Sequence, residues 1–170
     1  MIIILSGKAE AGKNKVADIM KSNLREKTII ISYAHYLKEY AKNVLNWDGN
    51  EKTKPRSFLQ EMGDIVKAKD PNFLIERVIE DIFVYSKFFE NIIISDARFR
   101  NEIETIKNKF NNVVTVRIDG KANHLTKKQQ THNTETALDD YKDFDYIIEN
   151  KGTISDLEVE VKKLLGEIKW

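Results

Sequence analysis

The 170-residue sequence contains no cysteine, two prolines and seven glycines. Without cysteine it can form no disulfide, thiolate metal site or cysteine nucleophile. The absence of cysteine fits a reducing compartment, and we expect a cytoplasmic protein. The longest apolar runs cover a few residues, against the ~20 that a membrane-spanning helix needs. A formal net charge of +1 gives no overall field toward nucleic acid or lipid, so any anion-binding site must be local.

The apolar residues are arranged as a single α/β domain over residues 1–170. Short β-branched runs that are apolar at successive positions predict strands buried on both faces. Between them, apolar residues recur at helical spacing, as at Val16, Ile19, Met20 and Leu24. Strands separated by helices favour a parallel sheet with right-handed crossovers. The predicted strands are 2–5, 28–32, 92–95, 113–118 and 146–148.

Two regions interrupt this alternation. Residues 33–91 contain no strand candidate and are long enough for three helices. They are either a substrate-holding insertion or plain helical packing. Residues 120–134 carry three lysines and two histidines without an acidic residue. They form either a cationic lid, with Lys127 and Lys128 near its tip, or a solvated basic loop.

A glycine loop follows the first predicted strand and opens the first helix. Its two glycines and its lysine have the spacing of a phosphate-binding P-loop. Glycines let backbone N–H groups approach oxygen anions, and the positive end of the next helix adds attraction. Position 14 is normally Ser or Thr, whose hydroxyl ligates Mg²⁺; here the carboxamide of Asn14 is a weaker metal ligand. The loop reads Gly7-Lys8-Ala9-Glu10-Ala11-Gly12-Lys13 and is followed by Asn14-Lys15.

A second charged motif follows the third predicted strand. Asp96 would lie at the carboxyl edge of the sheet, where parallel α/β proteins bind ligands. Its carboxylate could hold a metal-bound water or accept a proton, while Arg98 and Arg100 offer forked donors for a phosphate. The alternative is that Asp96 caps the next helix and that both arginines are solvated.

The insertion adds weaker candidates. Lys38 and Arg56 are candidate phosphate ligands, and Phe58 and Phe73 could stack on a base, although a buried aromatic residue is more often part of a core. The histidines at 124 and 132 lack the spacing of metal ligands.

With these motifs, the sequence resembles a deoxynucleoside monophosphate kinase of the phage and bacterial type, a P-loop kinase. The similarity covers nearly the whole chain, and the motif after the third strand is the most specific. The motifs are Leu5 to Lys13, Tyr33-Ala34-His35-Tyr36-Leu37-Lys38, Phe58-Leu59-Gln60-Glu61-Met62-Gly63, Asp70-Pro71-Asn72-Phe73, Ser95-Asp96-Ala97-Arg98-Phe99-Arg100-Asn101-Glu102, and His132-Asn133-Thr134-Glu135 with Leu138 and Asp139.

The resemblance implies a three-layer fold with a five-stranded parallel sheet, a helical insertion for the monophosphate and a short lid. It also implies that ATP and Mg²⁺ are bound and that the γ-phosphoryl group passes to a deoxynucleoside monophosphate. The residues of the loop, 7–15, would bind ATP, and Asn14 and, through water, Asp96 would contact Mg²⁺. The catalytic residues would be Lys13, Asp96, Arg98, Lys127 and Lys128. The substrate-binding residues would be Lys38, Arg56, Phe73, Asp96, Arg98, Arg100 and Glu135.

Other functions remain open at this point. The same fold could use another acceptor, as phosphomevalonate and dephospho-coenzyme A kinases do. Asn14 also fits an inactive relative that senses nucleotides. A nucleic-acid-binding module is disfavoured because no basic stripe is interleaved with aromatic residues. The sequence leaves open whether the protein forms a homodimer.

Overall fold

The computed structural model describes residues 1–120, 126–127 and 131–168. Its five strands form one sheet in the order β2-β3-β1-β4-β5, and every neighbouring pair is parallel. This confirms the predicted five-stranded parallel sheet. In the described part of the chain, no helix has the length and apolar content that a bilayer crossing requires. The strands are β1 (Ile2–Ser6), β2 (Thr28–Ile31), β3 (Asn91–Ala97), β4 (Val113–Gly120) and β5 (Tyr146–Asn150).

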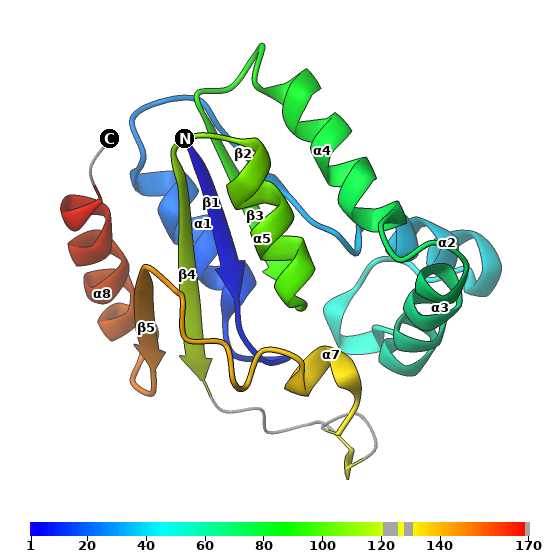
Figure 1. Ribbon diagram of the computed structural model, residues 1–170. Helices are drawn as coiled ribbons and strands as arrows, with labels where there is room; N and C mark the ends of the chain where they lie inside the picture. Colours follow the sequence, from blue (N-terminus) through cyan, green and yellow to red (C-terminus); the bar gives the residue numbers. More distant parts are fainter. Residues whose placement is uncertain (121–125, 128–130, 169–170) are drawn as a thin grey trace.

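Helices cover both faces of the sheet (Figure 1). On one face, α1 (Lys13–Asn23) and α8 (Ile154–Glu167) pack over Ile3 and Leu5 of β1. On the other face, α4 (Phe73–Tyr85) and α5 (Arg100–Lys109) pack over Ile2 and Ile4. Successive side chains of a strand point to opposite faces, so a strand buried on both sides is apolar at every position. The two cores therefore explain the uninterrupted apolar run of β1.

Residues 33–91 contain α2 (His35–Leu45), the short 3₁₀ turn η1 (Glu51–Thr53), α3 (Arg56–Lys69) and α4. Helix α4 belongs to the core, because five of its apolar residues are buried against the sheet and α5. Helix α3 contains no fully buried residue and packs beside α2, away from the sheet. Figure 1 shows this pair at the right of the view, next to α4 and to one side of the sheet. The pair is therefore free to form one wall of a pocket.

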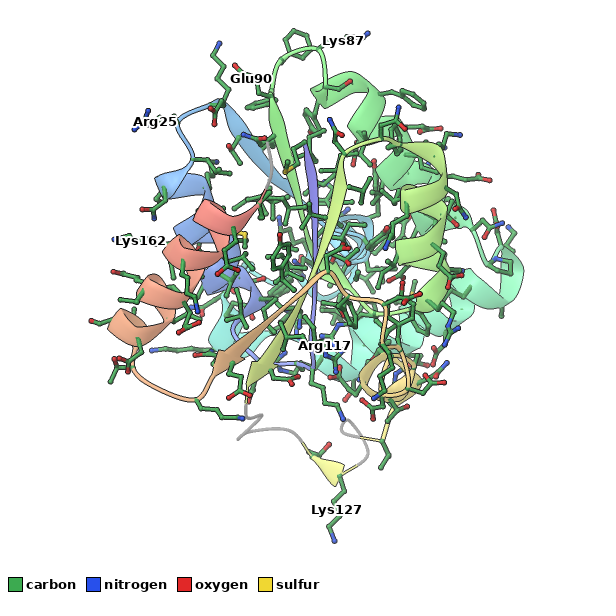
Figure 2. All side chains as sticks on the ribbon, turned by 60° about the vertical axis from the view of Figure 1, so that its left-hand side comes forward. Arg25, Lys87, Glu90, Arg117, Lys127 and Lys162 are labelled. Carbon is green, nitrogen blue, oxygen red and sulfur yellow. The ribbon has the colours of Figure 1, made fainter. Side chains whose placement is uncertain are left out.

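The segment around the predicted lid ends in α7 (Asn133–Thr136), which lies below the carboxyl edge of the sheet in Figure 1. Within the predicted lid, Lys128 lies outside the described residues. Lys127 is described and exposed, and in Figure 2 its side chain extends away from the body of the protein. The predicted catalytic role of these two lysines stays a prediction.

Candidate active site

The loop between β1 and α1 has the backbone of a phosphate cradle. Gly7 and Gly12 have φ angles of 153° and 97°, which L side chains rarely adopt. A Cβ atom on Gly7 would lie 2.5 Å from the carbonyl oxygen of Ile118, so the loop runs tight against β4. Gly12 occupies the N-cap position of α1, whose first-turn N–H groups have no partner within the helix. These N–H groups and the helix dipole favour an anion at this point.

Lys13 is buried within this loop, with 7% of its surface exposed. Its Nζ donates hydrogen bonds to the carbonyl oxygens of Gly7 and Lys8, at 2.7 Å each. Burial lowers the pKa of Lys13 well below its usual value, and the nearby Arg98 guanidinium lowers it further. A buried ammonium of this kind gains from any anion that replaces its lost hydration. The loop thus holds the Lys13 amino group in place, and a phosphate bound beside it would favour the charged form.

The loop opens on a pocket of about 330 Å³ that is bounded by α2, α3 and the segment after β3. This volume is at the lower end of the range for small-molecule sites. The pocket brings together eleven of the predicted site residues in its lining, with apolar walls from Leu37, Leu59, Leu74 and Phe99. The eleven are Ala9, Glu10, Gly12, Lys13, Asn14, Lys15, Lys38, Arg56, Asp96, Arg98 and Glu135.

Asp96 fixes the start of α2 to the end of β3. One carboxylate oxygen accepts a hydrogen bond from the N–H of Tyr33 at 2.7 Å, and the other accepts one from Ala34 at 3.1 Å. The helix after β3 is capped differently, because Glu102 accepts hydrogen bonds from the N–H groups of Arg98 and Phe99 at 2.7 and 3.1 Å. Asp96 therefore holds the two residues that precede α2 and does not cap α5, and it lines the pocket.

Arg98 and Glu135 form an ion pair at 2.7 Å inside the site. The second oxygen of Glu135 accepts a hydrogen bond from the N–H of Ala9 in the glycine loop at 2.6 Å. The buried Glu135 carboxylate thus links α7, the segment after β3 and the loop. Because both oxygens already bind the protein, the position of Glu135 suits holding Arg98 in place better than direct contact with an anionic substrate.

Arg56 joins the insertion to the loop. Its Nη2 lies 3.3 Å from a carboxylate oxygen of Glu10, and both side chains are largely buried. Glu10 has a positive φ of 65°, which is unusual for a residue with a side chain. The pair places the first turn of α3 beside the glycine loop, so a ligand of Arg56 would lie close to a ligand of Lys13.

Two predicted substrate-binding residues are not among those lining this pocket. The Arg100 side chain is 53% exposed and points toward Asp140, with 3.8 Å between their charged groups. Phe73 packs against the core, with the Arg77 guanidinium 5.8 Å from its ring. The substrate-binding roles of Arg100 and Phe73 stay predictions, and the positions of the two side chains outside the pocket lining do not favour them.

Sequence reasoning missed five charged residues that line the pocket, namely Glu51, Lys54, Asp64, Lys67 and Glu102. Lys54 is two residues before Arg56 and could have been found as part of the same basic cluster. Lys67 is eleven residues after Arg56, a spacing that returns to the same face of a helix. Glu102 gave no local signal for the pocket, because its contact with Lys67 of α3 exists only in the folded chain.

Comparison with known proteins places this site in a family. A family model described as phosphomevalonate kinase matches residues 5–112, more than half of the chain. The chain belongs to the phosphomevalonate kinase family. The matched region includes the glycine loop, α2, α3 and the segment after β3. A curated relative, the uncharacterized protein ORF77 of Ictalurid herpesvirus 1 (strain Auburn), is 35% identical over 118 residues. That alignment covers 68% of this chain and spans about half (50%) of the relative.

Solved structures similar to this family member are P-loop kinases. Shikimate kinase from Acinetobacter baumannii, in complex with shikimate, has a TM-score of 0.56 at 15% identity, with 99% of this chain and 94% of that chain covered. Dephospho-CoA kinase from Campylobacter jejuni has a TM-score of 0.54 at 16% identity, with 99% and 97% covered. At such identities the similarity shows the fold alone. It confirms the predicted P-loop kinase fold.

Kinases of this fold act on ATP with Mg²⁺, and the residues present fit both groups. The first-turn N–H groups of α1 are available to phosphate oxygens, and Lys13 supplies charge. Asn14 and Asp96 both line the pocket and carry oxygen donors, which Mg²⁺ prefers. Among the residues that the structure describes, no cluster of three or more His, Cys, Asp or Glu could hold a metal by itself. Mg²⁺ would therefore depend on phosphate oxygens and water as well.

Proposed function

We propose that the protein transfers the γ-phosphoryl group of ATP to the phosphate of a deoxynucleoside monophosphate. One observation carries the proposal: a single pocket joins Lys13 of the glycine loop to a second group of cations from other elements. Phosphoryl transfer between two phosphates needs both anions held close together with their charge neutralised. The second group consists of Lys38, Lys54, Arg56 and Arg98.

The acid–base chemistry supports an acceptor that is itself a phosphate. A phosphate monoester has a second pKa of about 6, so near neutral pH it is already a dianion and needs cations rather than a general base. An oxygen of this dianion would attack the γ-phosphorus, and the bond to the β-phosphate oxygen would break to release ADP. Asp96, whose two oxygens hold the turn before α2, then needs no proton-accepting role. A hydroxyl acceptor, as in the dephospho-coenzyme A kinase alternative, would need a group that accepts its proton, so it fits this site less well.

The shape of the pocket supports a nucleoside. Leu37, Leu59 and Phe99 provide apolar walls, and Gln60 adds an amide that can hydrogen-bond to a base. Such a mixture suits a flat, partly polar ring better than a short acyclic chain. The phosphomevalonate family match nevertheless favours phosphomevalonate as a second candidate, and it too would be phosphorylated on an existing phosphate. A cytoplasmic location, suggested by the lack of cysteine, accompanies either candidate as a prediction.

An acceptor panel tests the proposal. The protein is incubated with Mg²⁺-ATP and either dTMP, dGMP, dCMP, dAMP, phosphomevalonate or dephospho-coenzyme A. ADP release is coupled to a spectroscopic signal, and the product is identified by mass spectrometry. We expect at least one deoxynucleoside diphosphate. Turnover of phosphomevalonate alone would replace the first candidate by the second, and tight ATP binding without any turnover would favour a nucleotide sensor.

Two variants test whether the reaction takes place in the proposed site. Lys13→Ala should abolish transfer for every acceptor, and unchanged turnover would remove the glycine loop from the mechanism. Arg98→Ala should raise the KM of the acceptor more than the KM of ATP, because Arg98 lies on the acceptor side. An equal effect on both KM values would contradict that assignment.

A further inference from the structure

Helix α3 presents a stripe of residues to the pocket from one end to the other. Arg56, Gln60, Gly63 and Lys67 all line it, and their spacing of four, three and four residues keeps them on one helix face. Eleven residues of helix separate Arg56 from Lys67, which corresponds to ~16 Å along the axis. The pocket thus has a cation at each end of α3, and an elongated acceptor with its phosphate near Arg56 would direct its other end toward Lys67.

The ammonium of Lys67 is held in place by its surroundings. Nζ lies 3.7 Å from a carboxylate oxygen of Glu102 and 3.0 Å from the centre of the Phe99 ring. The Lys67 side chain is 26% exposed, whereas that of Glu102 is 4% exposed. Glu102 is itself fixed by the backbone N–H groups that begin α5. Two segments, the end of α3 and the start of α5, therefore meet at one ammonium, and little side-chain entropy remains to be lost when a ligand binds there.

Lysine has three N–H donors and no acceptor. One donor of Lys67 faces the carboxylate of Glu102 and another faces the ring of Phe99, which leaves a donor for the pocket. A fixed donor stabilises a carbonyl or carboxylate oxygen and cannot accept a hydrogen bond from an amino group. The far end of the pocket is therefore chemically selective.

We infer that Lys67 is the specificity-determining residue of the acceptor site, and that it selects acceptors whose end remote from the phosphate carries a carbonyl or carboxylate oxygen. The inference rests on the proposed function. Thymine and guanine present such oxygens at O4 and O6, whereas cytosine and adenine present amino groups at the equivalent positions. For nucleotide acceptors, the keto bases are therefore preferred. The carboxylate of phosphomevalonate shares the same chemistry.

The test compares nucleotides that differ in this one group. Dissociation constants are measured by calorimetry for dUMP against dCMP and for dIMP against dAMP, so that the result does not depend on turnover. The unaltered protein should bind the keto member of each pair at least ~10-fold more tightly, the range for a hydrogen bond to a charged group. Lys67→Gln should remove most of this preference, because an amide both donates and accepts hydrogen bonds.

Control variants distinguish the loss of the Lys67 contact from a change in folding. Lys69→Met removes an exposed lysine of the same helix that does not line the pocket, and it should keep the preference. Lys67→Met tests loss of the charge at similar length, and thermal melting shows whether each variant is folded. ATP affinity should be the same in all of them.

The outcomes separate this inference from the proposed function. Equal affinities within both pairs, or a preference that survives in folded Lys67→Gln, would overturn the role of Lys67 while nucleotide binding stands. If none of the four nucleotides binds, the nucleotide proposal fails. Phosphomevalonate then decides: at least ~10-fold weaker binding in Lys67→Gln supports the role of Lys67, and unchanged binding overturns it.

Discussion

The substitution Gly63→Ala should raise the stability of the protein and weaken the binding of the acceptor. Gly63 lies inside α3, and a Cβ atom built on it would lie 3.5 Å from Cδ1 of Leu37, an ordinary van der Waals contact. The fold therefore accommodates alanine. Glycine in a helix interior costs about 1 kcal/mol relative to alanine, so Gly63→Ala should stabilise the protein by up to this amount. For a chain of this size, the melting temperature should rise by roughly 2–4 °C.

The same methyl group should impair the acceptor site. Gly63 and Leu37 both line the pocket, so the added group takes space that the acceptor uses. Overfilling a packed site costs about 1–3 kcal/mol, which corresponds to roughly 5- to 150-fold weaker acceptor binding. The KM of ATP should not change, because the glycine loop is untouched.

Thermal melting and steady-state kinetics on the same preparation test both effects. Gly166→Ala provides the control, because Gly166 lies near the end of α8, outside the pocket lining, and a Cβ atom added to it would have nothing within 4 Å. The control should leave both KM values unchanged. A lower melting temperature for Gly63→Ala would refute the packing argument, and a higher one with an unchanged acceptor KM would refute the location of the acceptor.

Two further predictions concern charge and metal. Burial raises the pKa of Glu102 from 4.5 to about 7. The folded protein therefore binds this proton more tightly than the unfolded chain does. The free energy of unfolding should fall by about 3 kcal/mol as pH rises from 4.5 to 7. Glu102→Gln should flatten this slope in urea titrations over that pH range, and an unaltered slope would show that other groups cause it. Asn14→Thr should lower the Mg²⁺ concentration needed for half-maximal activity, because a hydroxyl replaces a carboxamide as the ligand. If the Mg²⁺ titration of activity does not change, the metal does not contact residue 14.

The sheet and the glycine loop follow from local sequence. β1 is apolar at successive positions because both of its faces are covered, and this pattern can be recognised without knowing what covers it. The loop between Gly7 and Lys13 is equally local, since glycine backbone freedom and the start of a helix together make an anion site. Short stretches of sequence were therefore enough to predict a five-stranded parallel sheet with a P-loop, and the structure confirms this prediction.

The acceptor end of the pocket depended on tertiary structure. Asp96 holds the turn before α2, more than sixty residues earlier in the chain, and no periodicity could indicate that partnership. Lys67 gains its fixed position from Glu102 and Phe99, which contact it only because the fold brings the end of α3 to the start of α5. Sequence patterns determined the elements and the phosphate loop because those depend on neighbouring residues. The partners of each charge were decided by the tertiary structure, because the energy of a buried charge depends on which distant segments surround it.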